Sequence, residues 1–274
     1  MAEPETSAND ISLRAAEVAA DVTETDQPQE RRRLVTAFTK AATSGARRAG
    51  RGTRAVGQRA SSGTQAARHR VGEGVSWLAD QVVAMAPRLR VRDQAALRAQ
   101  FPGKSADEIA DALIEGAARA AAATGGAAGA VSTLPVLPAF PVEIVAETLL
   151  LVGIELKLVA ELHEAYGSPA PGNFQERMSA YVASWAHRRG VFMIEGGLIM
   201  AAGSPLAQLL RRRLVARAGR SAFSLAPFLT GAAAGALFNR RETRRLGRDI
   251  QRDLRRRAID GPGDGKGDGN WWRR

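Results

Sequence analysis

The segment that most constrains the fold is long and largely apolar, "AETLLLVGIELKLVAELHEAYG" at residues 146–167. Pro141 lies just before it and Gly167 ends it, and these residue types favour the first turn and the end of a helix, respectively. We therefore predict one continuous helix from Pro141 to Tyr166. An apolar helix of this length either crosses a membrane or fills the interior of a helical bundle.

Charged residues within this helix argue against a membrane span. Those at interior positions are Glu147, Glu155, Lys157 and Glu161. At the centre of a bilayer these charges would together cost about 10 kcal/mol, whereas the surrounding Leu, Ile and Val residues would return only about 3–5 kcal/mol. The helix is therefore predicted to belong to a bundle and not to cross a membrane by itself.

Most charges of this helix fall on one stripe when they are projected at about 100° per residue. The stripe consists of Glu143, Glu147, Lys157, Glu161 and Glu164. We interpret it as the solvated face of an amphipathic helix. The alternative is a polar seam inside the bundle, formed by Glu147, Glu155, Lys157 and Glu161. Glu155 lies away from the stripe, and the sequence suggests no partner for it.

The rest of the chain also favours helices. Of its 274 residues 45% are hydrophobic but only 5% are aromatic, and the good helix formers Ala, Leu, Glu and Arg are abundant. Reciprocal capping boxes are predicted at Ser105–Glu108 and at Asn173–Glu176. We predict an all-α fold, a compact multi-helix bundle, with the helical domain at residues 75–258.

Two runs of small residues without charges lie at residues 120–142 and 221–239. Each contains two glycines four residues apart, namely Gly125, Gly129, Gly231 and Gly235. Glycines at this spacing lie on one helix face and let another backbone approach closely, in a protein core or in lipid. We predict that the two runs pack against each other through these glycines, inside the bundle or shallowly inserted in a membrane. By length alone, residues 221–239 are also compatible with a span.

The charge of the chain is distributed unevenly around a net value of +11. Residues 1–30 contain eight acidic residues, and residues 31–70 contain eleven basic residues and no acidic one. Because these segments have little to bury, we predict a disordered acidic-then-basic arm at residues 1–70. Residues 259–274 are predicted to be a flexible Gly-rich tail. The start of the chain lacks the apolar stretch of a signal peptide, so we expect a cytoplasmic protein.

The basic segments and the last tryptophans suit an anionic membrane surface. The residues expected to contact it are Arg47, Arg48, Arg51, Arg54, Arg244, Arg248, Arg255, Trp271 and Trp272. Nucleic-acid phosphates would attract the arginines of residues 31–70 in the same way. A solvated tail without any partner is the third interpretation.

Few residues could carry catalysis or hold a metal ion. The chain has no cysteine and three histidines that lie far apart, and it contains no zinc-protease, serine-hydrolase or phosphate-loop motif. His163 is expected at the surface near a helix end. We expect no metal, no cofactor and no catalytic residue. An enzyme that uses the carboxylates of Glu147, Glu155 and Glu161 is the alternative.

Four stretches carry a family resemblance. They are "FPGKSADEIADALIEGAARAAAATGGAAGA" at 101–130, "LHEAYG" at 162–167, "ERMSAYVASWAHRRG" at 176–190 and "PFLTGAAAGALFNRRETRRLG" at 227–247. Together they resemble the EcsC family of bacterial proteins, in particular its actinobacterial members, over roughly residues 75–257. The resemblance implies an all-helical, membrane-associated protein and transfers no catalytic residue to this chain.

Together these features predict a non-enzymatic helical protein at the cytoplasmic face of the inner membrane, peripheral or shallowly inserted. Its role would be structural or adaptor-like, linked to transport or envelope processes. The expected partner is an anionic membrane surface, with a membrane protein as a second candidate. A soluble nucleic-acid-associated protein that uses the basic residues 31–70 is the alternative.

Overall fold

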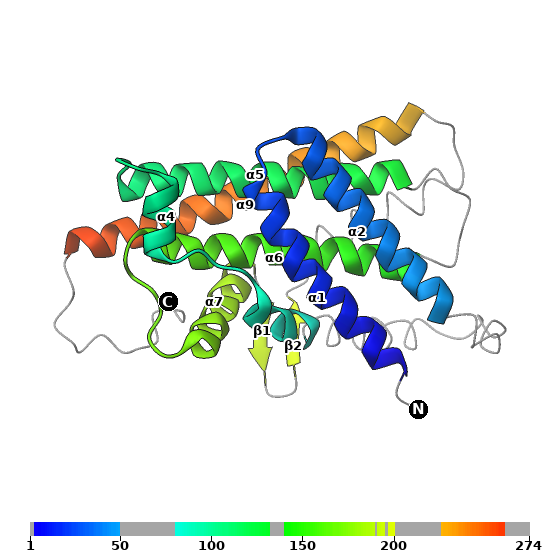
Figure 1. The fold of residues 1–274 in the computed structure, drawn as a ribbon, viewed down its shortest axis with the longest axis horizontal. Helices are drawn as coiled ribbons and strands as arrows, with labels where there is room; N and C mark the ends of the chain where they lie inside the picture. The colour runs from blue at the N-terminus through cyan, green and yellow to red at the C-terminus, as the bar shows by residue number, and fades with distance from the viewer. Residues whose placement is uncertain are drawn as a thin grey trace.

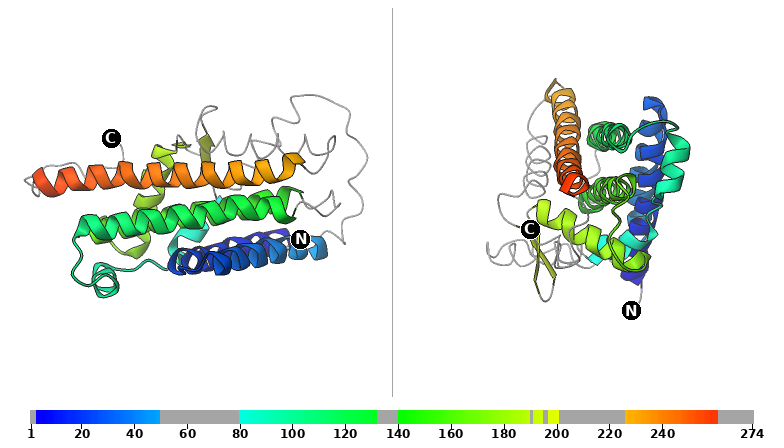
Figure 2. Two further views of the ribbon diagram at one scale, coloured as in Figure 1. Left: turned by 90° about the horizontal axis from the view of Figure 1, so that it is seen from above. Right: turned by 90° about the vertical axis from the view of Figure 1, so that its left-hand side faces the viewer.

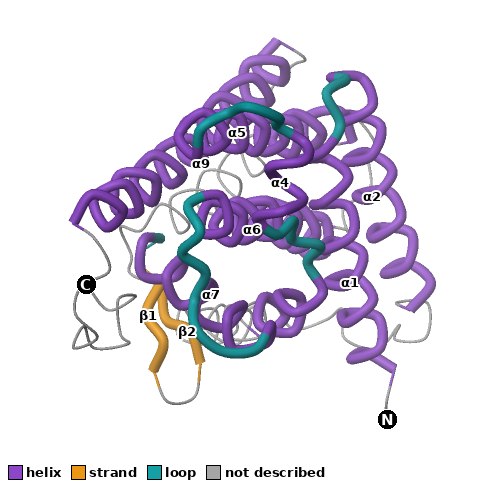
Figure 3. The backbone as a smooth tube through the Cα atoms, turned by 60° about the vertical axis from the view of Figure 1, so that its left-hand side comes forward, coloured by secondary structure: helices purple, strands orange, loops and turns teal. Residues whose placement is uncertain are grey.

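The structure is a computed structural model, and it describes residues 3–49, 80–131, 140–189, 191–194, 197–200 and 226–260. Its helices are α1 (Glu3–Glu24), α2 (Pro28–Ala49), α4 (Gln94–Gln100), α5 (Ala106–Val131), α6 (Phe140–Ala165), α7 (Phe174–Arg188) and α9 (Ala226–Asp260), with a 3-10 turn η2 (Ala86–Arg88) (Figure 1). The predicted all-α fold is confirmed. One antiparallel hairpin, β1 (Val191–Ile194) with β2 (Gly197–Met200), is a local exception within the described residues (Figure 3).

The helices are arranged in layers around α6. α5 and α6 lie side by side in the middle, α1 and α2 cover one side, and α9 and α7 lie on the other (Figure 2). α6 contacts α1, α2, α4, α5, α7 and α9, and every residue from 146 to 163 is buried. A helix that is apolar on nearly all sides is stable only when it is enclosed, and here the other helices enclose it.

The predicted start and end signals of the helices are present. α6 begins one residue before Pro141, and Gly167 follows its end with a φ of +63°, a conformation that glycine adopts without strain. Asn173 and Glu176 form a full capping box at the start of α7. Ser105 and Glu108 exchange the same pair of hydrogen bonds before α5. Local sequence therefore determines where these helices begin and end.

The first part of the chain is folded, which corrects one prediction. Residues 1–70 were expected to be a disordered arm, but residues 3–49 form α1 and α2, which pack on α5 and α6. α1 presents a face of small residues with no exposed surface, made of Ala15, Ala16, Ala19, Ala20 and Val22. Alanines bury little area each, but they let two helices approach closely, and hydrophobic composition alone undervalues this. The rest of the predicted arm, residues 50–70, lies outside the described residues.

Arg31 joins α1 to α2. Its side chain is buried, and it donates hydrogen bonds to the carbonyl oxygens of Val22 and Thr25 at the end of α1. These are carbonyls that a helix end leaves without an intrahelical partner. The first arginine of the basic segment is therefore a structural residue that closes the turn between the two helices.

α5 and α9 form the closest helix pair, and glycines lie at their crossing. A Cβ atom built on Gly125 would lie 2.7 Å from the carbonyl carbon of Gly235, so no side chain fits there. Nearby, Asn239 donates to the carbonyl of Ala121 and to Thr124 Oγ1, each at 3.2 Å. Gly125 and Gly235 thus meet at the crossing. Gly129 and Gly231 lie on the same helices, and contact between them stays a prediction.

We predict that Gly125→Ala lowers the free energy of unfolding. Overpacking at this crossing costs about 1–3 kcal/mol, which outweighs the gain of about 1 kcal/mol in helix propensity. Gly116→Ala on the same helix is the matched control, because its Cβ would meet only the carbonyl of Thr23 at 3.7 Å. Denaturant unfolding should rank Gly116→Ala at or above the wild type and Gly125→Ala below it. Equal stability of the two variants would contradict the close contact.

Candidate functional site

The charge that the sequence left without a partner, Glu155, lies at the centre of a buried polar cluster. Its two carboxylate oxygens accept from Arg189, with Nε 3.0 Å from Oε2, and the pair is almost fully buried. Trp185 Nε1 donates to Oε2 at 2.8 Å, and Thr243 Oγ1 donates to Oε1 at 2.9 Å. Because these partners come from the α7 end and from α9, the cluster links both elements to α6.

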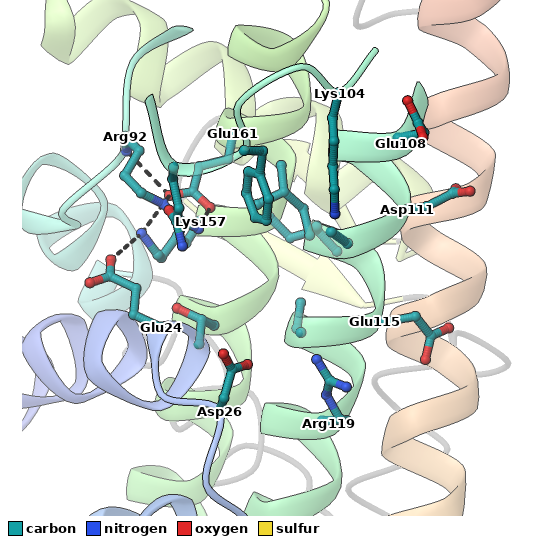
Figure 4. A pocket seen from close by; sticks show the side chains of 18 residues that line it. Glu24, Asp26, Arg92, Lys104, Glu108, Asp111, Glu115, Arg119, Lys157 and Glu161 are labelled. Carbon is teal, nitrogen blue, oxygen red and sulfur yellow. Dashed lines mark hydrogen bonds and ion pairs between the residues drawn. The ribbon is translucent and has the colours of Figure 1, made fainter. Parts of the chain in front are cut away.

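A second buried cluster surrounds Glu161. Its Oε2 accepts from Arg92 Nη2 at 2.7 Å, and its Oε1 accepts from Arg92 Nε at 2.8 Å and from Lys157 (Figure 4). Lys157 also donates to the carbonyl oxygen of Arg90 at 2.7 Å and pairs with Glu24 of α1 at 3.0 Å. Burial alone would lower the pKa of Arg92, but the hydrogen bond and charge of Glu161 raise it above its ordinary value.

These positions overturn the interpretation of the stripe as a solvated face. Glu147, Lys157 and Glu161 are each no more than 2% exposed. The reason is that α1 covers this side of α6, and α1 belongs to the segment that had been predicted to be disordered. Glu147, Glu155, Lys157 and Glu161 therefore all lie in the interior, which is where the polar-seam alternative put them. The side chain of Glu143 lies outside the described part.

His163 is buried, although a surface position was predicted. Its ring stacks on Tyr181 with 5.0 Å between centroids, and Nδ1 lies 3.2 Å from the carbonyl oxygen of Ser168. Burial lowers the pKa of His163 from 6.5 to about 4, and the hydrogen bond opposes this only in part. The imidazole is therefore neutral at pH 7 and belongs to the packing between α6 and α7.

The predicted surface-contact arginines of α9 pair with acidic residues of α5. Arg244 makes a two-fold hydrogen bond to Glu115, at 2.6 and 2.7 Å, and this bond lowers the pKa of Glu115. The other two pairs of this ladder are Arg248–Asp111 and Arg255–Asp107. Each of these arginines is thus paired within the protein while its side chain stays 38–61% exposed, and its contact with an external surface stays a prediction.

The remaining surface-contact residues have no described side chain. Arg47 and Arg48 lie in the last turn of α2, but only their helical backbone is described. Arg51, Arg54, Trp271 and Trp272 lie outside the described residues. Their contact with an anionic surface stays a prediction.

A different part of α9 faces outward. Leu237 is 66% exposed, and Arg241 and Arg245 follow it at four-residue intervals on the same exposed face. Neither arginine forms an ion pair with another residue of the described segments. We call Leu237, Arg241 and Arg245 the outer α9 patch. No sequence pattern marks this patch, because the helix contains basic residues on several faces.

The described residues offer little for catalysis or metal binding. Both oxygens of Glu155 and of Glu161 accept hydrogen bonds from arginine. Within the described segments no group of His, Asp or Glu residues could hold a metal ion. The same segments contain no helix that is both long and apolar enough to cross a membrane.

Two partners of the buried clusters were missed from the sequence. Neither Arg189 nor Arg92 lies in a motif that indicates a buried ion pair. Each lies more than thirty positions from the glutamate that it binds. One signal was available for Arg189. It lies near Trp185 at a helix end, and the preceding helix contains Glu155, a charge without a partner in the sequence pattern.

Comparison with known proteins identifies no relative. No protein-family model matches the chain, and neither a curated protein nor a solved structure does. The resemblance to the EcsC family therefore stays a prediction from four sequence stretches.

We predict that Arg189→Met lowers the free energy of unfolding by about 3–5 kcal/mol, because it leaves the carboxylate of Glu155 buried without its cation. Glu155→Met/Arg189→Met should cost less than the single substitution, although it removes more polar atoms. The control is the neighbouring Arg188→Met, which breaks a partly exposed pair with Asp253 and should cost at most about 1 kcal/mol. Equal losses for Arg188→Met and Arg189→Met, measured by denaturant unfolding, would refute the assignment.

We predict that His163 makes the fold sensitive to acid between pH 6.5 and about 4. Its pKa of about 4 in the fold lies below the value of 6.5 expected in the unfolded chain. The unfolded chain therefore binds more protons in this interval, and the stability held above pH 6.5 falls as the pH falls, by about 3 kcal/mol in full.

The measurement is the free energy of unfolding at several pH values for the wild type, His163→Asn and the exposed control His187→Asn. His163→Asn should be less stable at pH 7 but should lose less stability between pH 6.5 and 4.5. His187→Asn should follow the wild-type profile. A wild-type slope in His163→Asn would show that another group titrates.

Proposed function

We propose that this chain is a non-enzymatic helical protein with a structural or adaptor role, held at the anionic cytoplasmic surface of a membrane. The observation that carries the proposal is the outer α9 patch, in which an exposed leucine is followed by two exposed arginines that pair with no other described residue. Such a patch combines an apolar group for the headgroup boundary with cations for lipid phosphates.

The internal charge balance supports this use of the patch. The acidic residues of α5 neutralise Arg244, Arg248 and Arg255, so that the ladder adds little charge to the surface of α9. Arg241 and Arg245 are left to act outward. Each basic residue near an anionic surface contributes about 1 kcal/mol to binding, so two are enough for weak, reversible adhesion.

The saturated carboxylates support a role without catalysis. Glu155 and Glu161 are two of the three carboxylates that the enzyme alternative would use, and both hold arginines that connect separate parts of the fold. Such pairs fix the arrangement of helices. These contacts therefore support a structural or adaptor role, in which the protein acts through its fold and its surface.

Nucleic acid is the alternative partner for the same cations, because phosphates attract arginine in either setting. Leu237 decides between them in our proposal. A solvent-exposed leucine contributes nothing to a phosphate contact, whereas it gains by burial in the headgroup region. The nucleic-acid alternative first rested on the basic residues 31–70, and those beyond Ala49 lie outside the described residues.

The test is cosedimentation of the full chain with vesicles of equal amounts of phosphatidylglycerol and phosphatidylcholine. Arg241→Gln/Arg245→Gln should weaken binding roughly 10- to 30-fold, since two contributions of about 1 kcal/mol are lost. The matched control is Arg88→Gln/Arg98→Gln, which removes the same charge from exposed positions on η2 and α4. The control should bind nearly as the wild type does.

Two results would overturn the proposal. One is equal binding by both double variants, since the charge of the whole protein would then suffice. The other is a loss of duplex DNA binding in Arg241→Gln/Arg245→Gln with unchanged vesicle binding, which would assign the patch to nucleic acid. A Leu237→Gln variant should retain DNA binding and lose vesicle affinity if the leucine enters the headgroup region.

A further inference from the structure

The hairpin of β1 and β2 extends from the end of α7 away from α6 (Figures 1 and 3). Its first strand begins two residues after Arg189, whose guanidinium is held by the buried carboxylate of Glu155. The base of the hairpin is therefore fixed to the bundle by the same ion pair that joins α7 to α6.

Both faces of the hairpin consist of apolar residue types. Because successive residues of a strand belong to opposite faces, the register divides the two strands into two sets. One face has Val191, Met193, Leu198 and Met200, and the other has Phe192, Ile194, Gly197 and Ile199. Neither face contains a charge that would repel a neighbouring strand, and β-branched and aromatic residues form favourable pairs across strands.

The outer edge of β2 has no partner strand in the described part of the chain. The sheet there has two strands, and its ladder joins β1 to β2. β1 also contacts α7, whereas β2 contacts no other described element to a comparable extent. Alternate residues of β2 direct their N–H and C=O groups away from β1, as in any antiparallel pair. These groups form a template for a further strand.

The edge of β2 also lacks the features by which proteins prevent such pairing. Charged residues and proline commonly protect an edge strand, and the sequence "GLIM" at residues 197–200 contains neither. A hairpin of two short strands gains stability when further strands are added to it. β2 is therefore suited to pair with another strand.

A second copy of this chain fits this edge better than lipid does. Lipid could contact the apolar faces, but it cannot form hydrogen bonds with the edge, and open sheet edges do not occur in the hydrocarbon region of a membrane. The other described elements are helices, so the described segments supply no third strand. When a two-fold axis passes through the sheet beside β2, β2 of a second copy runs antiparallel to the first, and one surface matches itself.

We propose that this chain forms a two-fold symmetric dimer, in which β2 of each copy pairs antiparallel with β2 of the other to give a four-stranded sheet. Backbone hydrogen bonds and apolar cross-strand pairs hold the two copies together. The surface is separate from the outer α9 patch, and the proposal does not depend on the membrane role proposed above.

Sedimentation equilibrium of the full chain in solution, without vesicles, tests the proposal. The wild type should associate into dimers as its concentration rises. Ile199→Lys should raise the dissociation constant of the dimer about tenfold or more, because each dimer then carries two like charges on one face near the two-fold axis and loses two apolar residues.

Phe192→Lys is the matched control. Phe192 lies directly opposite Ile199 on the same face of the hairpin, but it belongs to β1 and not to the edge that pairs. This variant should dimerise nearly as the wild type does. Equal weakening by Phe192→Lys and Ile199→Lys would contradict pairing through β2.

Disulfide formation provides a second measurement that does not place a charge in the hairpin. The chain has no cysteine, so an introduced thiol can only pair with its copy in another molecule. Ile199→Cys should form a covalent dimer under mild oxidation, because the two-fold axis brings the two positions close together. Leu237→Cys, at a position of α9 that is 66% exposed, should remain monomeric under the same conditions.

Two results would overturn the dimer. One is a monomeric wild type at every concentration, and the other is equal crosslinking of Ile199→Cys and Leu237→Cys. A monomeric wild type whose vesicle binding falls in Ile199→Lys would assign the hairpin to lipid instead. The membrane proposal is tested by Arg241→Gln/Arg245→Gln, so the two proposals fail separately.

Discussion

The architecture depends on a buried carboxylate, Glu155, held by Arg189 in the middle of α6. An ion pair removed from water is stable only when nearly all of its hydrogen bonds are made, and here Trp185 and Thr243 complete the set. The pair therefore forms only when the end of α7 and the middle of α9 both contact α6 at the position of Glu155. Apolar packing tolerates small displacements, but this cluster does not, so it selects one arrangement of three helices.

Enclosure of α6 is the second requirement, and it explains why the first helices matter. α6 carries Lys157 and Glu161 on one face, and neither could remain under an apolar cover without compensating charges. α1 brings Glu24 to Lys157, and the segment before α4 brings Arg92 to Glu161. The charges of α1 and of the segment before α4 thus complement those of α6, while the alanines of α1 allow it to approach α6 closely. The acidic composition of α1, a sign of disorder by itself, is part of this match.

Local features of the fold could be predicted from the sequence, and long-range ones could not. Pro141, Gly167 and Asn173 act within a few residues of themselves, so helix ends follow from short motifs. The Gly125–Gly235 contact was predictable because glycine spacing marks a face. Glu155 was recognised as an exception, but its partner is 34 positions away on another helix. No periodicity identifies such a partner, and the same limit hid the burial of His163 beneath Tyr181.

The α5–α9 pair illustrates how two weak kinds of contact define one geometry. The glycine crossing allows a single distance of approach, but two smooth helices could still slide or roll against each other there. The ladder from Glu115 to Asp107 lies farther along the pair, and its arginines reach their partners at only one axial offset. The glycine crossing thus sets the distance between the two helix axes. The ion pairs set how far α9 is shifted along α5 and how it is rotated about its own axis. The outward direction of Arg241 and Arg245 is therefore determined in large part by residues that never touch them.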